Sequence, residues 1–244
     1  MIAPVTTDAI DAVAIGTAVV SYIEPHPGAE RAFNRWYELD HFYSAVMAGP
    51  GAFAGGRWVA TRACKDVRPD GALFGDPARG TYLAAAWVLA GAQAGWDAWI
   101  AGQMDVLRAE DRLFPGRDHV HTAIYRLRSE VRAPNGPPAA VALDRCFPGI
   151  VALAVERAAA VDGWVGTLVG PDVPVAVVLT RERVAVTTLD DPDEHLLVLA
   201  FVEGEVLDVW RRVVAPALDD LPRVGFASPF LRTVPGTDTH VEAR

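Results

Sequence analysis

Apolar runs separated by Pro- and Gly-rich breaks define the predicted elements of the first half of the chain. Residues 13–24 are rich in Val, Ile and Ala and end at Pro25-His26-Pro27-Gly28, which predicts a buried strand followed by a turn. Apolar residues at helical spacing, with a Pro-Gly pair after each stretch, predict helices over 28–48 and 92–114. Apolar runs bounded by polar loops predict three more strands at 53–62, 81–90 and 119–128. The predicted order is therefore βαββαβ.

The same order recurs, in a shorter form, after a segment rich in Pro and Gly. Residues 134–138, Pro-Asn-Gly-Pro-Pro, cannot continue a strand or a helix and are predicted to be a linker. The second pass has predicted strands at 149–156, 175–186, 195–202 and 226–234, with helices at 162–169 and 205–221. The split βαββαβ order is that of a ferredoxin-like domain. We therefore expect an α+β chain made of two tandem ferredoxin-like halves, residues 1–133 and 139–244.

The composition is that of a globular protein and excludes several classes of partner. Of the 244 residues, 51% are apolar and 22% are charged, unlike a disordered chain. The net charge of -9 leaves no basic stripe to displace counterions from phosphates, so we expect no nucleic-acid partner. No apolar run reaches the roughly 18 residues of a membrane span, and residues 1–5 show no basic leader region. The two cysteines lie far apart in the sequence, and a reducing cytoplasm is the expected location.

The segment from Phe33 to Phe53 places several chemically active side chains on one helix. Phe33, Tyr37 and His41 recur every four residues and share one stripe, with Trp36 on the neighbouring stripe. A helix face built only for burial rarely combines a phenol with an imidazole. The segment resembles the first helix of the dimeric α/β-barrel (ferredoxin-like) superfamily, in which a Trp-Tyr-x-x-x-His pattern precedes a Pro-Gly-aromatic turn. The matching residues are Trp36, Tyr37, His41, Pro50, Gly51 and, one position late, Phe53.

This resemblance implies how the two halves fit together. Members of the superfamily usually pair sheet to sheet as dimers, whereas a tandem-repeat member carries both sheets in one chain. We therefore expect an intramolecular pseudo-dimer that closes a dimeric α/β-barrel by itself. The predicted 162–169 helix is short and has no Tyr or His, so we expect one functional pocket, in the first half, and a structural second half.

The predicted site uses imidazole and phenol groups for proton transfer. Either His41 or His121 is the predicted base, and Tyr37 is predicted to stabilise an oxyanion; capping of the helix end is the alternative role for His41. His119 and His121, two residues apart on a strand, are expected on one face, with His119 more exposed. Glu24 and Arg57 are further polar candidates for the site, and surface charge is the favoured interpretation of both. The predicted substrate-binding residues are aromatic, namely Phe33, Trp36, Trp58, Trp87 and Tyr125.

The sequence lacks the motifs of common cofactor sites. It has no G-x-G-x-x-G after the first strand, no phosphate-binding Lys loop, no G-x-S-x-G and no H-E-x-x-H. His41, His119 and His121 have no carboxylate companion at a fixed spacing, so no metal is expected. Tandem folds that resemble the chlorite dismutases bind haem through a histidine on a helix, normally in the second half. That half has only His195, before a strand, and His240, in the tail, so no haem is expected.

These observations favour a cofactor-independent enzyme that moves protons on a small apolar molecule. The resemblance implies a range of reactions, those of isomerases, cyclases, lyases and cofactor-free monooxygenases, on carbonyl, polyketide-like or terpenoid-like substrates. The alternative is a non-catalytic protein that binds such a molecule. Because both halves lie in one chain, we expect a monomer, or a homodimer formed through the helices.

Overall fold

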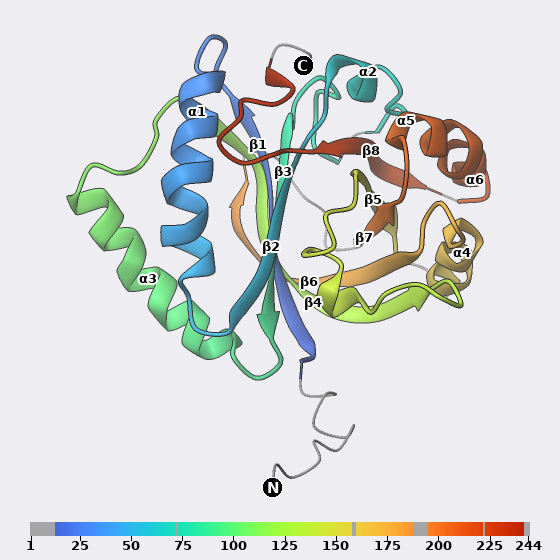
Figure 1. The fold of residues 1–244 in the computed structure, drawn as a ribbon, viewed down its shortest axis with the longest axis horizontal. Helices are drawn as coiled ribbons and strands as arrows, with labels where there is room; N and C mark the ends of the chain where they lie inside the picture. Colours follow the sequence, from blue (N-terminus) through green and yellow to red (C-terminus); the bar gives the residue numbers. More distant parts are fainter. Residues whose placement is uncertain (1–12, 72, 158–159, 188–194, 222, 242–244) are drawn as a thin grey trace, which may run out of the picture.

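Eight antiparallel strands form one closed barrel in the computed structural model, which describes residues 13–71, 73–157, 160–187, 195–221 and 223–241. The order around the barrel is β1-β3-β2-β8-β5-β7-β6-β4 (Figure 1). The predicted lack of a leader at residues 1–5 lies outside the described residues. The strands are β1 (Ile15–Pro25), β2 (Ala52–Val59), β3 (Tyr82–Leu89), β4 (Arg117–Arg132), β5 (Gly149–Glu156), β6 (Val175–Thr187), β7 (His195–Val202) and β8 (Val224–Arg232).

The barrel consists of two arcs that meet at two seams. Strands β4, β1, β3 and β2 are consecutive in one arc, and β8, β5, β7 and β6 are consecutive in the other. The β4–β6 seam is long, running from His121 opposite Thr187 to Arg132 opposite Val175. The β2–β8 seam is short and pairs Trp58 with Arg232 and Val59 with Leu231. The α+β class and the positions of the eight strands agree with the prediction, and β4 extends into the segment that precedes the predicted linker.

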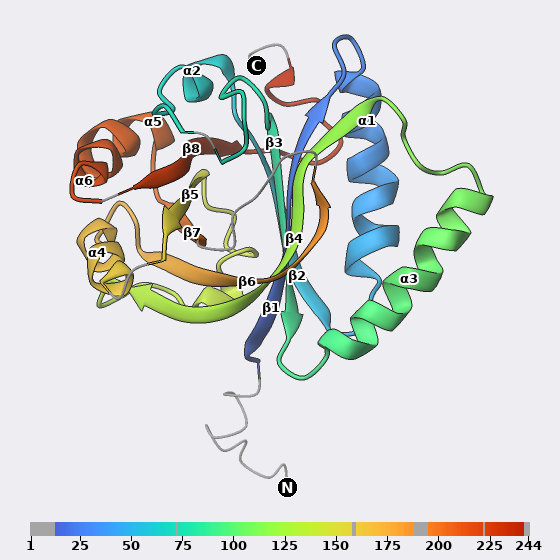
Figure 2. The ribbon, with the colours of Figure 1, turned by 180° about the vertical axis from the view of Figure 1, so that it is seen from behind.

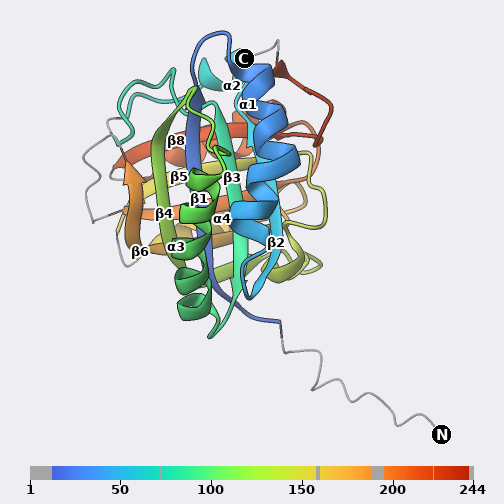
Figure 3. The ribbon, with the colours of Figure 1, turned by 90° about the vertical axis from the view of Figure 1, so that its left-hand side faces the viewer.

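Helices cover the barrel on two opposite sides (Figures 1 and 2). On one side lie α1 (Glu30–Trp36), which continues as the π-helical turns η2 (Tyr37–His41) and η3 (Tyr43–Met47), and α3 (Gln93–Ala109). Figure 3 shows these two helices side by side over the strands of the first arc. On the other side lie α4 (Val161–Leu168), α5 (Val206–Val209), η5 (Trp210–Val214) and α6 (Ala215–Leu218). None of the helices in the described part of the chain is long and apolar enough to cross a membrane.

The inside of the barrel is filled by side chains and by the connection between β4 and β5. Trp58 and Trp87 are both 0% exposed and belong to the interior core. The connection contains the short 3-10 helix η4 (Ala139–Val141), and its residues Ala139, Leu143 and Phe147 join the same core. Trp87 Nε1 donates a hydrogen bond to the carbonyl oxygen of Ala139 at 3.1 Å. The predicted linker therefore leads into a segment whose side chains pack in the barrel interior.

The outer faces of the two arcs differ in how completely their helices cover them. Helices α4 to α6 pack on the second arc through one large apolar core that includes Val151, Leu153, Trp164, Val198 and Trp210. On the first arc, two smaller cores form instead, one around Phe33 and the other around Trp96. Between these two cores, the helices α1–η3 and α3 do not pack directly against the sheet.

Candidate functional site

A cavity of about 440 Å³ lies between the first arc of the sheet and the helices α1–η3 and α3. A volume of this size is within the usual range for small-molecule sites. Its walls come from β1, β4, β6, the two π-helical turns and α3, so no single segment of the chain forms it. The described lining residues are Val19, Ser21, Ile23, Tyr37, His41, Ala45, Val46, Trp96, Ile100, Met104, Arg117, His119, Thr122, Ile124, Arg183, Ala185 and Val186.

The cavity has a mainly apolar end, at which the lining residue Arg183 is paired with Asp97, and a polar end. In the antiparallel β1–β4 ladder, Val19 pairs with Ile124, and Ile23 pairs with His119 two residues from Arg117. At the Val19–Ile124 end, Trp96 packs into an apolar core, and its Nε1 donates to the Val46 carbonyl at 3.2 Å. The opposite end carries Arg117, His119, His41 and Tyr37. A ligand would therefore bury an apolar body and present polar atoms to these four side chains.

The π-helical turn η2 gives His41 its position at this polar end. In an α-helix, residues five apart point about 140° away from each other, since each residue turns by 100°. Here the amide of Phe42 bonds to the carbonyl of Tyr37, an i to i+5 bond, which brings residues five apart closer together. As a result, the His41 ring stacks on Trp36 with centroids 4.2 Å apart. The Arg117 guanidinium lies 4.5 Å from the centre of the Trp36 ring.

His41 is held as a neutral imidazole in this environment. Burial lowers its pKa to about 3, and the nearby charge of Arg117 adds to the shift. Its Nδ1 is buried and has no hydrogen-bond partner among the described residues. Asp40 does not orient it, because the Asp40 carboxylate is paired with Arg112, which also lowers the pKa of Asp40.

His119 lines the cavity, whereas it was expected to be exposed. The expectation that His119 and His121 share a face is wrong, because the β1–β4 register shifts between Tyr22 and Ile23. A bulge of this kind adds one residue to β4 and turns the two histidines to opposite faces of the sheet. His119 faces the helices and His121 faces the barrel interior, so the two imidazoles cannot share a metal ion with His41.

Hydrogen bonds around His119 assign its tautomer. His119 Nδ1 lies 3.0 Å from Thr122 Oγ1, and Thr122 donates its hydroxyl hydrogen to Ser21 Oγ at 3.1 Å. Thr122 has one hydrogen to donate, so it accepts from His119 Nδ1–H, and the lone pair lies on Nε2. Burial lowers the pKa of His119 to about 4, with a further contribution from Arg117. Nε2 of a neutral, oriented imidazole is therefore available as a proton acceptor.

Tyr37 lines the cavity beside His41, with ring centroids 5.5 Å apart. Burial raises the pKa of Tyr37 to about 12, against the opposing charges of Arg57 and Arg117. The phenol is thus protonated at neutral pH and can donate a hydrogen bond to an oxygen atom in the cavity.

The other predicted site residues lie outside the cavity lining. Phe33 and Trp36 are close behind it, in contact with Tyr37 and His41 respectively. His121 is 0% exposed inside the barrel, where its Nε2 lies 2.8 Å from the hydroxyl of Tyr125. Trp58 and Trp87 are also interior residues. Strands with both faces covered have apolar residues on both, so the sequence does not show which aromatic rings face the helices.

Sequence reasoning missed Arg117, Arg183, Ile100 and Met104 as lining residues. Met104 and Ile100 belong to the helical pattern of α3 and could have been found by their spacing. Arg117 follows the Pro115-Gly116 turn and looks like an ordinary strand-end charge. Arg183 lies on β6, and its approach to the first arc depends on the barrel seam, which no local pattern reveals.

Arg57 is a buried residue, so its interpretation as a surface charge is wrong. The Arg57 and Glu38 side chains are 4% and 5% exposed and form an ion pair with Nη1 and Oε1 2.7 Å apart. Arg57 Nη2 also donates to Asn34 Oδ1 at 2.6 Å, and Glu38 Oε2 accepts from the amide of Gly236 at 2.7 Å. This network ties α1–η2 to β2 and to the C-terminal segment, which fixes the helix that carries His41.

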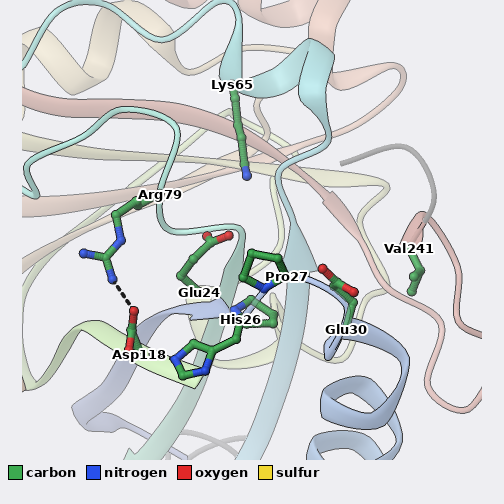
Figure 4. Close-up of a pocket in the computed structure, with 9 residues that line it drawn as sticks. Glu24, His26, Pro27, Glu30, Lys65, Arg79, Asp118 and Val241 are labelled. Carbon is green, nitrogen blue, oxygen red and sulfur yellow. Dashed lines mark hydrogen bonds and ion pairs between the residues drawn. The ribbon is translucent and has the colours of Figure 1, made fainter. Parts of the chain in front are cut away.

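A second hollow, of about 530 Å³, lies at the end of the barrel beside α2 (Arg62–Lys65) (Figure 4). Three of its polar groups contact each other: Arg79 Nη2 lies 2.8 Å from Asp118 Oδ2, and His26 Nε2 lies 3.1 Å from Asp118 Oδ1. Glu24, also interpreted as a surface charge, is partly buried here and accepts the Thr81 hydroxyl at 2.6 Å. Paired charges and few apolar walls make this hollow a weaker candidate for small-molecule chemistry than the cavity beneath the helices.

The described residues of the second half do not fit a haem. Buried apolar side chains fill the space beneath α4 to α6, and the two tryptophans of those helices are part of that packing. His195 begins β7 and His240 lies in the C-terminal turns, so neither supplies an axial imidazole from a helix.

No protein-family model and no curated protein sequence matches the chain. A solved structure described as a "Putative Chlorite dismutase" superposes with a TM-score of 0.53 at 12% identity, covering 95% of this chain and 100% of that chain. An "anthrone oxidase-like protein" gives 0.48 at 9% identity over 91% and 93% of the two chains. A "putative monooxygenase" from Lactobacillus acidophilus gives 0.45 at 11% identity over 90% and 94%. The first likeness supports the fold alone: the chain shares the α+β barrel architecture of the chlorite dismutase-like structure.

Proposed function

We propose that the chain is a cofactor-independent enzyme that moves a proton on a small apolar carbonyl compound, with isomerase, cyclase or lyase chemistry as the reaction class. One observation carries the proposal: a cavity of about 440 Å³ has a mainly apolar end and, at its other end, two neutral imidazoles and a phenol. His119 takes the place that the sequence suggested for His121, because His121 does not line the cavity.

The proposed step is removal of a proton from the carbon beside the carbonyl group. The C–H electron pair forms an enolate, and the proton moves to Nε2 of His119 or to His41. Tyr37 donates its hydroxyl hydrogen bond to the enolate oxygen. The low pKa values of the two imidazoles are compatible with this step, because they reflect loss of solvent and, to a smaller extent, repulsion from Arg117. A new negative charge beside the imidazolium offsets both effects.

The test follows exchange of the α-protons of 2-tetralone, a small apolar ketone, for deuterium in D2O by NMR. We expect the protein to accelerate exchange above the buffer rate, and His119→Ala or His41→Ala to lower the catalysed rate by about 10². His26→Gln is the matched control, since His26 lies in the second hollow and outside the cavity. The proposal is rejected if both cavity variants exchange the ketone as fast as the parent protein.

A non-catalytic binder is the second candidate. The observation that favours it is the low pKa of both cavity histidines, which makes each a weak base until an anion is present. Native mass spectrometry of protein purified from its own host separates the two candidates. A retained small molecule that the protein never converts would favour the binder.

We also propose that the barrel is an intramolecular pseudo-dimer of two ferredoxin-like halves. In its support, the strand order β4-β1-β3-β2 of residues 1–133 has the same form as β8-β5-β7-β6 of residues 139–244. Since the two arcs already pair with each other, we propose a monomer, or a homodimer through the helices, which light scattering would distinguish. The free cysteines, Cys64 and Cys146, are consistent with the cytoplasmic location that we propose.

A further inference from the structure

Arg117 is a partly buried cation at the polar end of the cavity. Within the described residues, no carboxylate lies within ion-pair distance of its guanidinium, and its Nε is buried without a hydrogen-bond partner. Its guanidinium lies over the face of the Trp36 ring. Arg57, Arg112 and Arg183, by contrast, are each paired with an acidic side chain. Arg117 therefore differs from these three arginines, because its positive charge is not balanced by a carboxylate among the described residues.

The surroundings of Arg117 add to this difference. None of the described residues that line the cavity is acidic, although the whole chain has a net charge of -9. His41 and His119 are neutral and offer Arg117 no countercharge. A buried cation without a partner is costly, whereas one that is paired and hydrogen-bonded is tolerated. An anionic atom of a ligand would supply the missing partner.

We infer that the cavity binds a small apolar molecule with one anionic oxygen group, a carboxylate or an enolate, and that Arg117 recognises this charge. The guanidinium offers several N–H donors in a planar fork, which suits a carboxylate. The apolar body would lie along Ile100, Met104 and Ile124, so an inorganic anion would lack most of the contacts. This inference rests on the proposed function, because it takes the same cavity as the substrate site.

Two probes of nearly equal shape test the inference by isothermal titration calorimetry at neutral pH. 2-Naphthoate carries the anion, and 2-naphthamide replaces it with a neutral group. We expect the protein to bind naphthoate about 10- to 100-fold more tightly, as is usual for a charge-assisted hydrogen bond. Arg117→Met should remove most of this preference, and Arg117→Lys should keep part of it, since lysine retains the charge without the fork. Arg79→Met is the matched control, because it removes an arginine charge from the second hollow, outside the cavity.

Three results would overturn the inference: equal binding of the two probes by the parent protein, an undiminished preference in Arg117→Met, or no saturable binding of either probe. The thermal midpoint of each variant shows whether it is folded. The outcome is separable from that of the proposed function. Histidine-dependent exchange of 2-tetralone without a naphthoate preference would reject the anion and keep the enzyme. An Arg117-dependent naphthoate preference without any exchange would reject the enzyme and keep the anion.

Discussion

The buried histidines should make the stability of this protein fall steeply in mild acid. His41, His119 and His121 have pKa values lowered to about 3, 4 and 4, chiefly by burial. An unfolded histidine has a pKa of about 6.5, so between pH 6.5 and 4 the unfolded chain binds more protons than the folded one. Stability is therefore complete above pH 6.5 and is lost as the pH falls from there toward the folded values.

The size of the effect follows from the same pKa values. Between pH 7 and pH 5, each histidine that stays neutral in the fold lowers the free energy of unfolding by about 2 kcal/mol, and three give an upper bound of about 6 kcal/mol. This is a large share of the 5 to 15 kcal/mol typical of a folded protein. Partial exposure of His41 and His119 reduces their contributions, whereas His121 is fully buried.

His121→Gln provides the sharpest comparison. Glutamine can retain a hydrogen bond to Tyr125 but cannot be protonated, so the variant should lose about 2 kcal/mol less than the parent between pH 7 and pH 5. Urea unfolding followed by tryptophan fluorescence at both pH values measures the difference. An identical pH dependence in His121→Gln and the parent would refute the reasoning.

Three further predictions concern other parts of the molecule. Arg57→Met leaves Glu38 buried without its partner and should lower the free energy of unfolding, measured with urea, by about 3 to 5 kcal/mol. Replacing both residues by Met should recover part of that loss. Equal losses in the single and double variants would contradict the role of the buried pair. Cys146 is exposed, whereas Cys64 is buried and its pKa is raised. One thiol should therefore react rapidly with Ellman's reagent in the folded protein, and two thiols should react after denaturation. Cys146→Ser should abolish the rapid reaction. Met104→Trp should fill the cavity and weaken 2-naphthoate binding at least about tenfold, while the thermal midpoint stays nearly unchanged. Unchanged binding would show that the ligand binds elsewhere.

The element order could be predicted because apolar runs and Pro-Gly breaks are local signals. The predicted strand at 149–156 agrees with β5, and the predicted helix at 28–48 contains α1, η2 and η3. The π-helical turns could not be predicted from a period of 3.6 residues, and they determine which side chains meet His41. The contact between Trp36 and His41 was missed for this reason.

The site was predicted only in part. Both faces of the barrel strands carry apolar residues, so the sequence does not show which side chains face the helices and which face the barrel interior. Tyr37 and His41 were found because they lie on one helix with an unusual pattern. His119 and His121 were placed on the same face because no sequence signal marks the bulge between them. Arg117 was missed because its importance lies in the absence of a partner among the described residues, which only the surrounding side chains reveal.

The most direct test of the central claim is a crystal structure of the protein with 2-naphthol, which resembles the enol of 2-tetralone. Our account predicts the rings against Ile100 and Met104 in the cavity beneath the two helices, with the oxygen atom within hydrogen-bond distance of His119, Tyr37 or Arg117. Binding of 2-naphthol in the second hollow, or at any other place outside the cavity, would contradict the claim that this cavity is the functional site.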